Sequence, residues 1–226
     1  MPNVSTLFIV ATPLGNLNDI SLRALDTLRN VDVIACEDTR VSSKLLAHYD
    51  ISKPLLSYWQ HSKSVQTEKV LALLGQGKTV ALLTDAGTPG IADPGGRLVA
   101  AVSLAGYNVI PVPGPSAIVT ALSISGFAAD EFMFFGFLPH KKGRQTKLQE
   151  VVTTTTTAVL YESVHRIEKL LQQLIEYGIG DRRIVLAREL TKKFETIYRG
   201  TAKEVLAQLS ADTIKGEFVL VMDRKN

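Results

Sequence analysis

The chain has 226 residues and a net charge of +3, with 46% hydrophobic and 21% charged residues. These values are ordinary for a globular protein, and no apolar run approaches the roughly 20 residues of a membrane helix, so a membrane-spanning protein is excluded. The mild basicity permits a polyanionic partner without requiring one. A single cysteine, Cys36, excludes an internal disulfide, and no basic region precedes the short apolar run at 7–11, so we expect a cytoplasmic protein.

Apolar runs of strand length alternate with helical patterns in the first half of the chain, which predicts a parallel sheet. The segment 111–115 contains three prolines, which no regular element is expected to cross. We therefore expect two domains, residues 1–113 and 114–226. The predicted strands of the first are 7–11, 31–36, 79–84 and 107–112, and its helices are 20–28, 42–47, 65–74 and 98–104.

The second half starts a new series of elements, several of them joined by short links, so its sheet is predicted to be mixed. The fold class is therefore α/β, with a parallel-sheet N-terminal domain, a mixed-sheet C-terminal domain and a cleft between them. The predicted strands of the C-terminal domain are 132–137, 158–161, 183–187, 195–199 and 218–223, and its helices are 116–123, 144–152, 166–177 and 202–209.

A loop rich in glycine and proline, Asp85–Gly95, directly follows the third predicted strand and reads D-A-G-T-P-G-I-A-D-P-G. Glycine lets backbone amides approach a ligand closely, and proline fixes the shape of the loop. Open α/β sheets bind small molecules at the carboxyl ends of their strands, where this loop lies. The pattern predicts a ligand loop, with a tight strand-to-helix connection as the alternative.

Two acidic residues, Glu37 and Asp38, end the second strand about 22 residues beyond Gly15, a spacing that a dinucleotide fold would use to hold a ribose. However, Pro13 stands where that fingerprint needs a glycine. The two carboxylates therefore face a substrate, or they cap the helix that contains residues 42–47.

Charged side chains also gather at strand ends of the second half. The segments 161–166 and 187–193 each follow a strand, and 215–217 precedes the last one, which suggests a lined pocket. The densest basic patch is Lys141–Arg144, which suits a polyphosphate backbone, with a solvated loop as the alternative.

Taken together and in this order, seven motifs resemble the ribosomal RNA small-subunit methyltransferase I family of the tetrapyrrole methylase superfamily. They span nearly the whole chain. The motifs are A-T-P-L-G-N-L-N-D-I (11–20), C-E-D-T-R (36–40), D-A-G-T-P-G-I-A-D-P-G (85–95), P-G-P-S-A (113–117), Y-E-S-V-H-R (161–166), A-R-E-L-T-K (187–192) and K-G-E (215–217).

The resemblance implies methyl transfer from S-adenosylmethionine to the ribose 2′-hydroxyl of a cytidine in the decoding region of 16S ribosomal RNA. The expected partners are small-subunit ribosomal RNA or the assembled subunit and a second copy of the chain, with no membrane, DNA or metal. The residues that it places around the cofactor are Leu14, Gly87, Thr88, Ile91, Ala92, Ser116, Ala117, Tyr161, Arg188 and Gly216.

A sulfonium methyl group is already a strong electrophile, so the enzyme must chiefly align the ribose oxygen with it. A neutral hydroxyl is a poor nucleophile, and a general base would help. The candidate bases are Glu189, Glu37, Asp38 and, more weakly, His61; after Tyr58 the family tends to show a second histidine that this chain lacks. The candidate RNA-binding residues are Arg40, His61, Lys141, Lys142, Arg144, Arg166 and Lys192.

The sequence leaves two other functions open and argues against a third. A tetrapyrrole C-methyltransferase of the same superfamily would want a large apolar trough in place of the basic patch. A non-catalytic RNA-binding assembly factor would have no need for intact glycine loops. A dinucleotide oxidoreductase lacks its fingerprint here.

Overall fold

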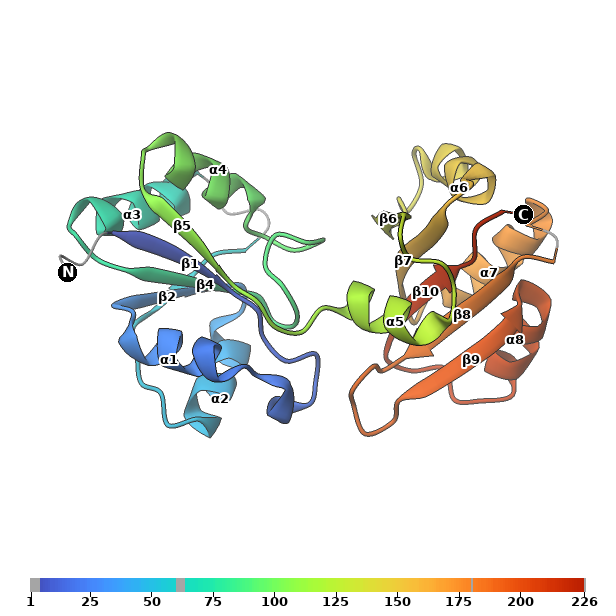
Figure 1. Cartoon of the computed structure of the whole chain (residues 1–226), viewed down its shortest axis with the longest axis horizontal. Coiled ribbons are helices and arrows are strands. Elements are labelled where there is room, and N and C mark those ends of the chain that lie inside the picture. The colour runs from blue at the N-terminus through green and yellow to red at the C-terminus, as the bar shows by residue number, and fades with distance from the viewer. Residues whose placement is uncertain (1–4, 60–63, 180, 226) are drawn as a thin grey trace. The chain divides into compact units, whose positions relative to one another are not determined.

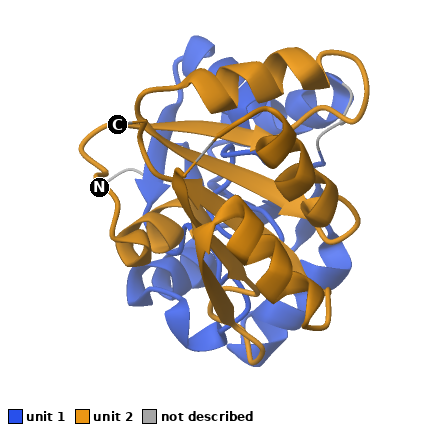
Figure 2. Ribbon diagram, turned by 90° about the vertical axis from the view of Figure 1, so that its right-hand side faces the viewer, with its two compact units in different colours: residues 1–116 blue, residues 117–226 orange. Residues whose placement is uncertain are grey.

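The computed structural model describes residues 5–59, 64–179 and 181–225. The chain divides into two compact units, residues 1–116 and 117–226, drawn in blue and orange in Figure 2. The division after Ser116 falls directly behind the proline-rich segment in which we expected the joint. No helix in the described ranges combines the length and the apolar character needed to cross a membrane.

Within the described residues, unit 1 contains a five-stranded parallel sheet in the order β3-β2-β4-β1-β5, and Figure 1 labels these strands except β3. Its central strands β2 and β4 are buried along their whole length, as expected for a parallel sheet with helices on both faces. The strands are β1 (Thr6–Val10), β2 (Val33–Cys36), β3 (Leu55–Ser57), β4 (Val80–Leu83) and β5 (Asn108–Val112).

Helices cover both faces of this sheet, α1 and α2 on one and α3 and α4 on the other (Figure 1). Successive residues of β4 enter opposite cores, with Ala81 beneath α1 and α2, and Leu82 beneath α3 and α4. The elements are η1 (Leu17–Asp19), α1 (Leu22–Asn30), α2 (Thr39–His48), α3 (Ser64–Gly75) and α4 (Gly96–Leu104).

Unit 2 contains a mixed sheet in the order β6-β7-β10-β8-β9, in which only β6 and β7 are parallel among the described pairs. Helix α5 packs on one face, and α6, α7 and α8 pack on the other. The elements are α5 (Ala117–Ser125), β6 (Phe132–Phe137), α6 (Arg144–Thr153), β7 (Thr157–Ser163), α7 (Ile167–Glu176), β8 (Arg183–Arg188), β9 (Thr196–Thr201), α8 (Ala202–Ser210) and β10 (Glu217–Met222).

The predicted α/β fold with a parallel and a mixed sheet is confirmed, with two corrections in unit 1. The expectation that no regular element crosses residues 111–115 is wrong, because Pro111 lies in β5 and pairs with Ile9 of β1. β5 is an edge strand with β1 as its neighbour, so the missing N–H of a proline can face outward. The short strand β3 was not predicted, since its three residues are too few to show a pattern.

Cys36 is fully buried at the end of β2, and burial raises the pKa of its thiol. A thiol with a raised pKa carries little thiolate at neutral pH. Cys36 is therefore a buried packing residue of the unit 1 core.

Candidate functional site

Three loops of unit 1 meet at the carboxyl edge of the parallel sheet. Thr12, after β1, exchanges two backbone hydrogen bonds with Gly87, after β4, at 3.0 and 2.9 Å. The Thr88 hydroxyl donates a hydrogen bond of 3.1 Å to the carbonyl oxygen of Pro115, which follows β5. These contacts fix the glycine-rich loop against its two neighbours at the place where open α/β sheets bind ligands.

Two glycines allow close packing of the loops at this edge. A Cβ on Gly95 would lie 2.9 Å from Leu82 Cδ2 and 3.2 Å from Gly90 N, and the φ of Gly95 is +141°. A Cβ on Gly114 would lie 3.1 Å from that of Ala11. Gly95 is buried against the core beneath α3 and α4, so it lets the base of the loop pack there, and Gly114 lets the segment after β5 approach the segment after β1.

The predicted cofactor residues of unit 1 come together at this edge. Leu14 is buried beside Gly87, while Ile91 and Ala92 are exposed on the loop itself. Ala92 adopts a left-handed φ of +60°, an uncommon conformation for a residue with a side chain. The six residues are Leu14, Gly87, Thr88, Ile91, Ala92 and Ser116.

Of the two acidic residues after β2, Asp38 is the N-cap of α2. Its carboxylate accepts a hydrogen bond of 2.8 Å from the Arg40 backbone N–H and pairs with the Arg40 guanidinium at 2.6 Å. Hydrogen bonds from the Arg40 side chain and backbone lower the pKa of Asp38 to about 2. Such a carboxylate is a weak proton acceptor, so the capping alternative describes Asp38 best.

Glu37 has the opposite electrostatic environment. Its pKa is raised, first by burial and then by the negative charge of Asp85 at the end of β4. Asp85 Oδ1 accepts a hydrogen bond of 3.2 Å from the Asp38 backbone N–H, so the loops after β2 and β4 are linked. Asp85 opens the loop that the sequence predicted to bind a ligand, but its effect on Glu37 was not predicted, because it depends on the adjacency of β2 and β4. No group of three or more possible metal ligands occurs in the described part of the chain.

In unit 2, Ala117 and Tyr161 lie on the α5 face of the mixed sheet. The Tyr161 ring contacts those of Phe134 and Phe137 at centroid distances of 5.0 and 5.5 Å. Successive strand residues alternate between faces, so the side chain of Arg188 points to the other face. There it binds Asp212 and Thr213 after α8, and Tyr198 binds the same Asp212 carboxylate.

Glu189 and Lys192 lie beyond the end of β8 and bind each other. Lys192 Nζ is 2.9 Å from Glu189 Oε1 and 2.9 Å from Glu217 Oε2, and the Glu217 backbone N–H donates to Glu189 Oε1 at 2.9 Å. Burial alone would raise the pKa of Glu189, but these hydrogen bonds outweigh it and the pKa is lowered. Glu189 is thus less suited than Glu37 to accept a proton, and Lys192 is engaged by two carboxylates.

The predicted RNA-binding residues separate into two kinds. Glu162 is fully buried and pairs with the Arg166 guanidinium at 2.6 Å and with that of Arg144 at 3.6 Å. Arg144 is itself buried and also donates to Gln173 and Pro139. These two arginines therefore form a structural ion-pair network around Glu162 inside unit 2. Lys141, Lys142 and Arg40 remain exposed, and His61 lies outside the described residues.

The fold is that of a class of methyltransferases. The family model of tetrapyrrole (corrin/porphyrin) methylases matches residues 6–206. Among solved structures, a cobalt precorrin-4 methyltransferase aligns with a TM-score of 0.71 at 19% identity, covering 96% of this chain and 94% of the other. A uroporphyrin-III C-methyltransferase from Thermus thermophilus, solved with S-adenosyl homocysteine, aligns with a TM-score of 0.67 at 17% identity and covers 96% of both chains.

Curated relatives are much more similar. A Ribosomal RNA small subunit methyltransferase I from Synechocystis is 46% identical over 217 residues, which are 96% of this chain and 78% of the relative. The Bacillus subtilis protein of the same name is 43% identical over 225 residues, with 99% and 77% covered. The chain therefore belongs to the tetrapyrrole methylase family and, within it, to the ribosomal RNA small subunit methyltransferase I group, as the motifs predicted.

Proposed function

We propose that this protein transfers a methyl group from S-adenosylmethionine to the ribose 2′-hydroxyl of a cytidine in the decoding region of 16S ribosomal RNA. The observation that carries the proposal is the convergence, at one sheet edge, of the glycine-rich loop after β4 with Glu37 after β2, a carboxylate of raised pKa. We also propose that the protein is a cytoplasmic homodimer and that it acts on small-subunit RNA or on the assembled subunit.

The residues of unit 1 fit a cofactor of this kind. A ligand bound through peptide groups needs exposed backbone, and residues 90–92 of the glycine-rich loop are exposed. Thr88 and Leu14 would flank it, with Ala117, Tyr161 and Gly216 as the expected contributors from unit 2. When bound, the cofactor supplies the electrophilic methyl group.

The chemistry needs alignment and a proton acceptor. Holding the ribose oxygen in line with the carbon–sulfur bond can lower the barrier by about 7–11 kcal/mol. As the new oxygen–carbon bond forms and the sulfur–carbon bond breaks, the hydroxyl proton passes to a carboxylate, for which we propose Glu37. Its raised pKa brings it closer to the pKa that suits a general base near neutral pH.

Mass mapping of small-subunit RNA tests this function. RNA from a strain that lacks the protein, incubated as naked RNA or as assembled subunits with the purified chain and S-adenosylmethionine, is expected to gain one ribose methyl group on a cytidine of the decoding region. A methyl group on a base, or on a tetrapyrrole acceptor in its place, would contradict the proposal.

The glycine-rich loop provides a test of the cofactor site. Gly95→Ala is expected to weaken binding of S-adenosylhomocysteine by about 10-fold or more, because the added Cβ must displace Leu82 or the Gly90 backbone. Isothermal titration calorimetry measures the affinity. Gly77→Ala is the matched control, since Gly77 also has a positive φ, +81°, but a Cβ there meets nothing within 4 Å. Equal affinities for both variants would contradict this placement.

Lys141 and Lys142 are the proposed phosphate contacts. Each alanine substitution is expected to weaken RNA binding about equally for different RNA sequences and to reduce the slope of log K against log salt by about 1. Filter binding at several salt concentrations measures both quantities. Lys203→Ala, which removes an exposed lysine on α8, is the control. An unchanged slope for the Lys141 and Lys142 variants would exclude them from the RNA interface.

A further inference from the structure

Two consecutive residues at the end of β8 hold the two ends of one segment, residues 212–217. Arg188 Nη1 donates to Asp212 Oδ2 at 3.0 Å and to the Thr213 carbonyl oxygen at 2.6 Å. The Glu189 backbone N–H donates to the Glu217 carbonyl oxygen at 2.9 Å, and Glu217 returns a hydrogen bond to the Glu189 carboxylate. Gly216 lies between these two attachments.

A third side chain completes the attachment at Asp212. The Tyr198 hydroxyl of β9 donates to Asp212 Oδ2 at 2.6 Å, so one carboxylate oxygen receives hydrogen bonds from two strands. Burial, followed by the hydrogen bond to Asp212, raises the pKa of Tyr198 to about 12. The hydroxyl therefore stays protonated near neutral pH and can donate to Asp212.

The direction of the Arg188 side chain decides what it can do. Ile184 and Leu186 of β8 enter the core beneath α6 to α8, while Val185 and Ala187 enter the core beneath α5. By this alternation, Arg188 points away from the face that carries Ala117 and Tyr161. Its side chain is nine-tenths buried, and its guanidinium contacts the segment after α8.

The structure around Gly216 does not accommodate a larger residue. Its φ is +92°, and a Cβ there would lie 2.4 Å from the side chain of Glu189, which Lys192 and the Glu217 N–H hold in place. The positive φ of Gly216 disfavours any other residue, and the Glu189 side chain leaves no space for a Cβ.

We propose that Arg188 is a positioning residue, which acts through Asp212 to fix the segment 212–217 and so to hold the Gly216 backbone in place for the cofactor. This role differs from the direct cofactor contact that the sequence motif suggested for Arg188. It rests on the proposed function, because Gly216 is a proposed cofactor residue.

A double-mutant cycle on the full chain tests the route through Asp212. Arg188→Met and Asp212→Ala are each expected to weaken S-adenosylhomocysteine binding by about 10-fold, the loss of a charge-assisted hydrogen bond. The double variant is expected to bind about as weakly as either single one, because both changes release the same segment. Tyr198→Phe, which deletes one hydroxyl group, is expected to weaken binding by a few-fold.

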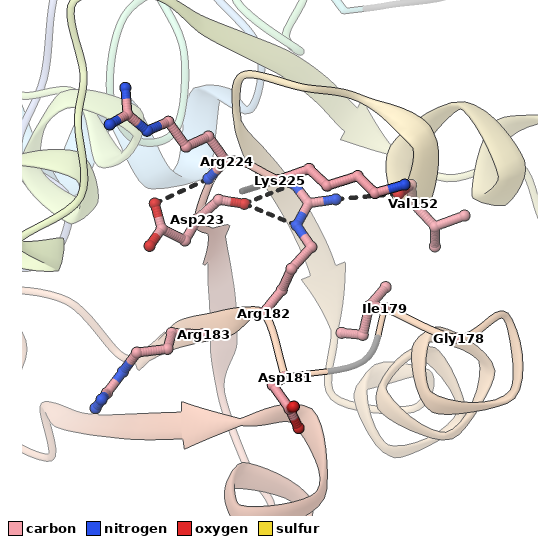
Figure 3. A pocket seen from close by; sticks show the side chains of 9 residues that line it. All are labelled: Val152, Gly178, Ile179, Asp181, Arg182, Arg183, Asp223, Arg224 and Lys225. Carbon is pink, nitrogen blue, oxygen red and sulfur yellow. Dashed lines mark hydrogen bonds between the residues drawn. The ribbon is translucent and has the colours of Figure 1, made fainter.

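Arg182→Met is the matched control. Arg182 precedes the opposite end of β8, and its guanidinium likewise holds backbone carbonyls, those of Asp223 and Val152 (Figure 3). This variant is expected to lower the melting temperature by circular dichroism without changing the affinity for S-adenosylhomocysteine. An equal loss of affinity in Arg182→Met would show that the effect at Arg188 comes from general destabilisation and not from a positioning role.

The outcomes also separate this proposal from the proposed cofactor site. If Asp212→Ala binds like wild type, or if the effects of the two changes multiply to about 100-fold, Arg188 does not act through Asp212. If Gly216→Ala weakens binding but Arg188→Met does not, only the positioning role fails. If neither change matters, the placement of the cofactor against Gly216 fails as well.

Discussion

Glu37→Gln is expected to lower kcat for RNA methylation by about 10²- to 10⁴-fold, the usual contribution of a general base, with little change in cofactor affinity. Glutamine keeps the shape of the side chain but cannot accept the ribose proton. Single-turnover assays with small ribosomal subunits measure the chemical step, and calorimetry measures cofactor binding.

The role of Glu37 as a base also predicts how kcat changes with pH. A general base works in its ionised form, so kcat should fall as the pH drops through the pKa of Glu37, which lies above its ordinary value because of burial and the charge of Asp85. Asp85→Asn removes that charge and keeps an oxygen acceptor for the Asp38 N–H. The fall in kcat is then expected at a lower pH than in wild type. A shift toward higher pH, or none, would argue against an electrostatic effect of Asp85 on the base.

Asp38→Asn is the comparison that decides between the two neighbouring carboxylates. Asparagine is as good an N-cap as aspartate, so α2 should keep its first turn. We expect a far smaller loss of kcat than for Glu37→Gln, since the Asp38 carboxylate is occupied by Arg40. The reverse order of the two losses would identify Asp38 as the base.

Glu162→Gln is expected to destabilise the folded chain by about 3–5 kcal/mol, the usual cost of breaking a buried ion pair from one side. Glutamine leaves the guanidinium groups of Arg144 and Arg166 without their common negative partner. Urea denaturation, followed by circular dichroism, measures the free energy of unfolding.

Glu168→Gln is the control for this change, because Glu168 lies exposed in the first turn of α7. Surface substitutions of this kind usually change stability by less than about 0.5 kcal/mol. Equal stabilities for the Glu162 and Glu168 variants would show that the buried charges find other partners.

Local pattern determined much of this protein in advance. The alternation of apolar runs with helical periods predicted the parallel sheet of unit 1, because buried parallel strands must be apolar and their crossovers helical. The order of the seven motifs predicted the family, and the glycine spacing of residues 85–95 predicted a ligand loop. Hydrophobic patterns and motifs of this kind are formed by residues close together in the sequence, so they can be recognised before the fold is known.

The roles of individual charged residues depended on the tertiary structure. Arg144 and Arg166 read as surface cations in the sequence, but Glu162 holds both inside unit 2. Strand alternation turns Arg188 toward Asp212, and the adjacency of β2 and β4 brings Asp85 beside Glu37. A charge acquires its role from the groups around it, and those groups come from distant parts of the chain that only folding brings together.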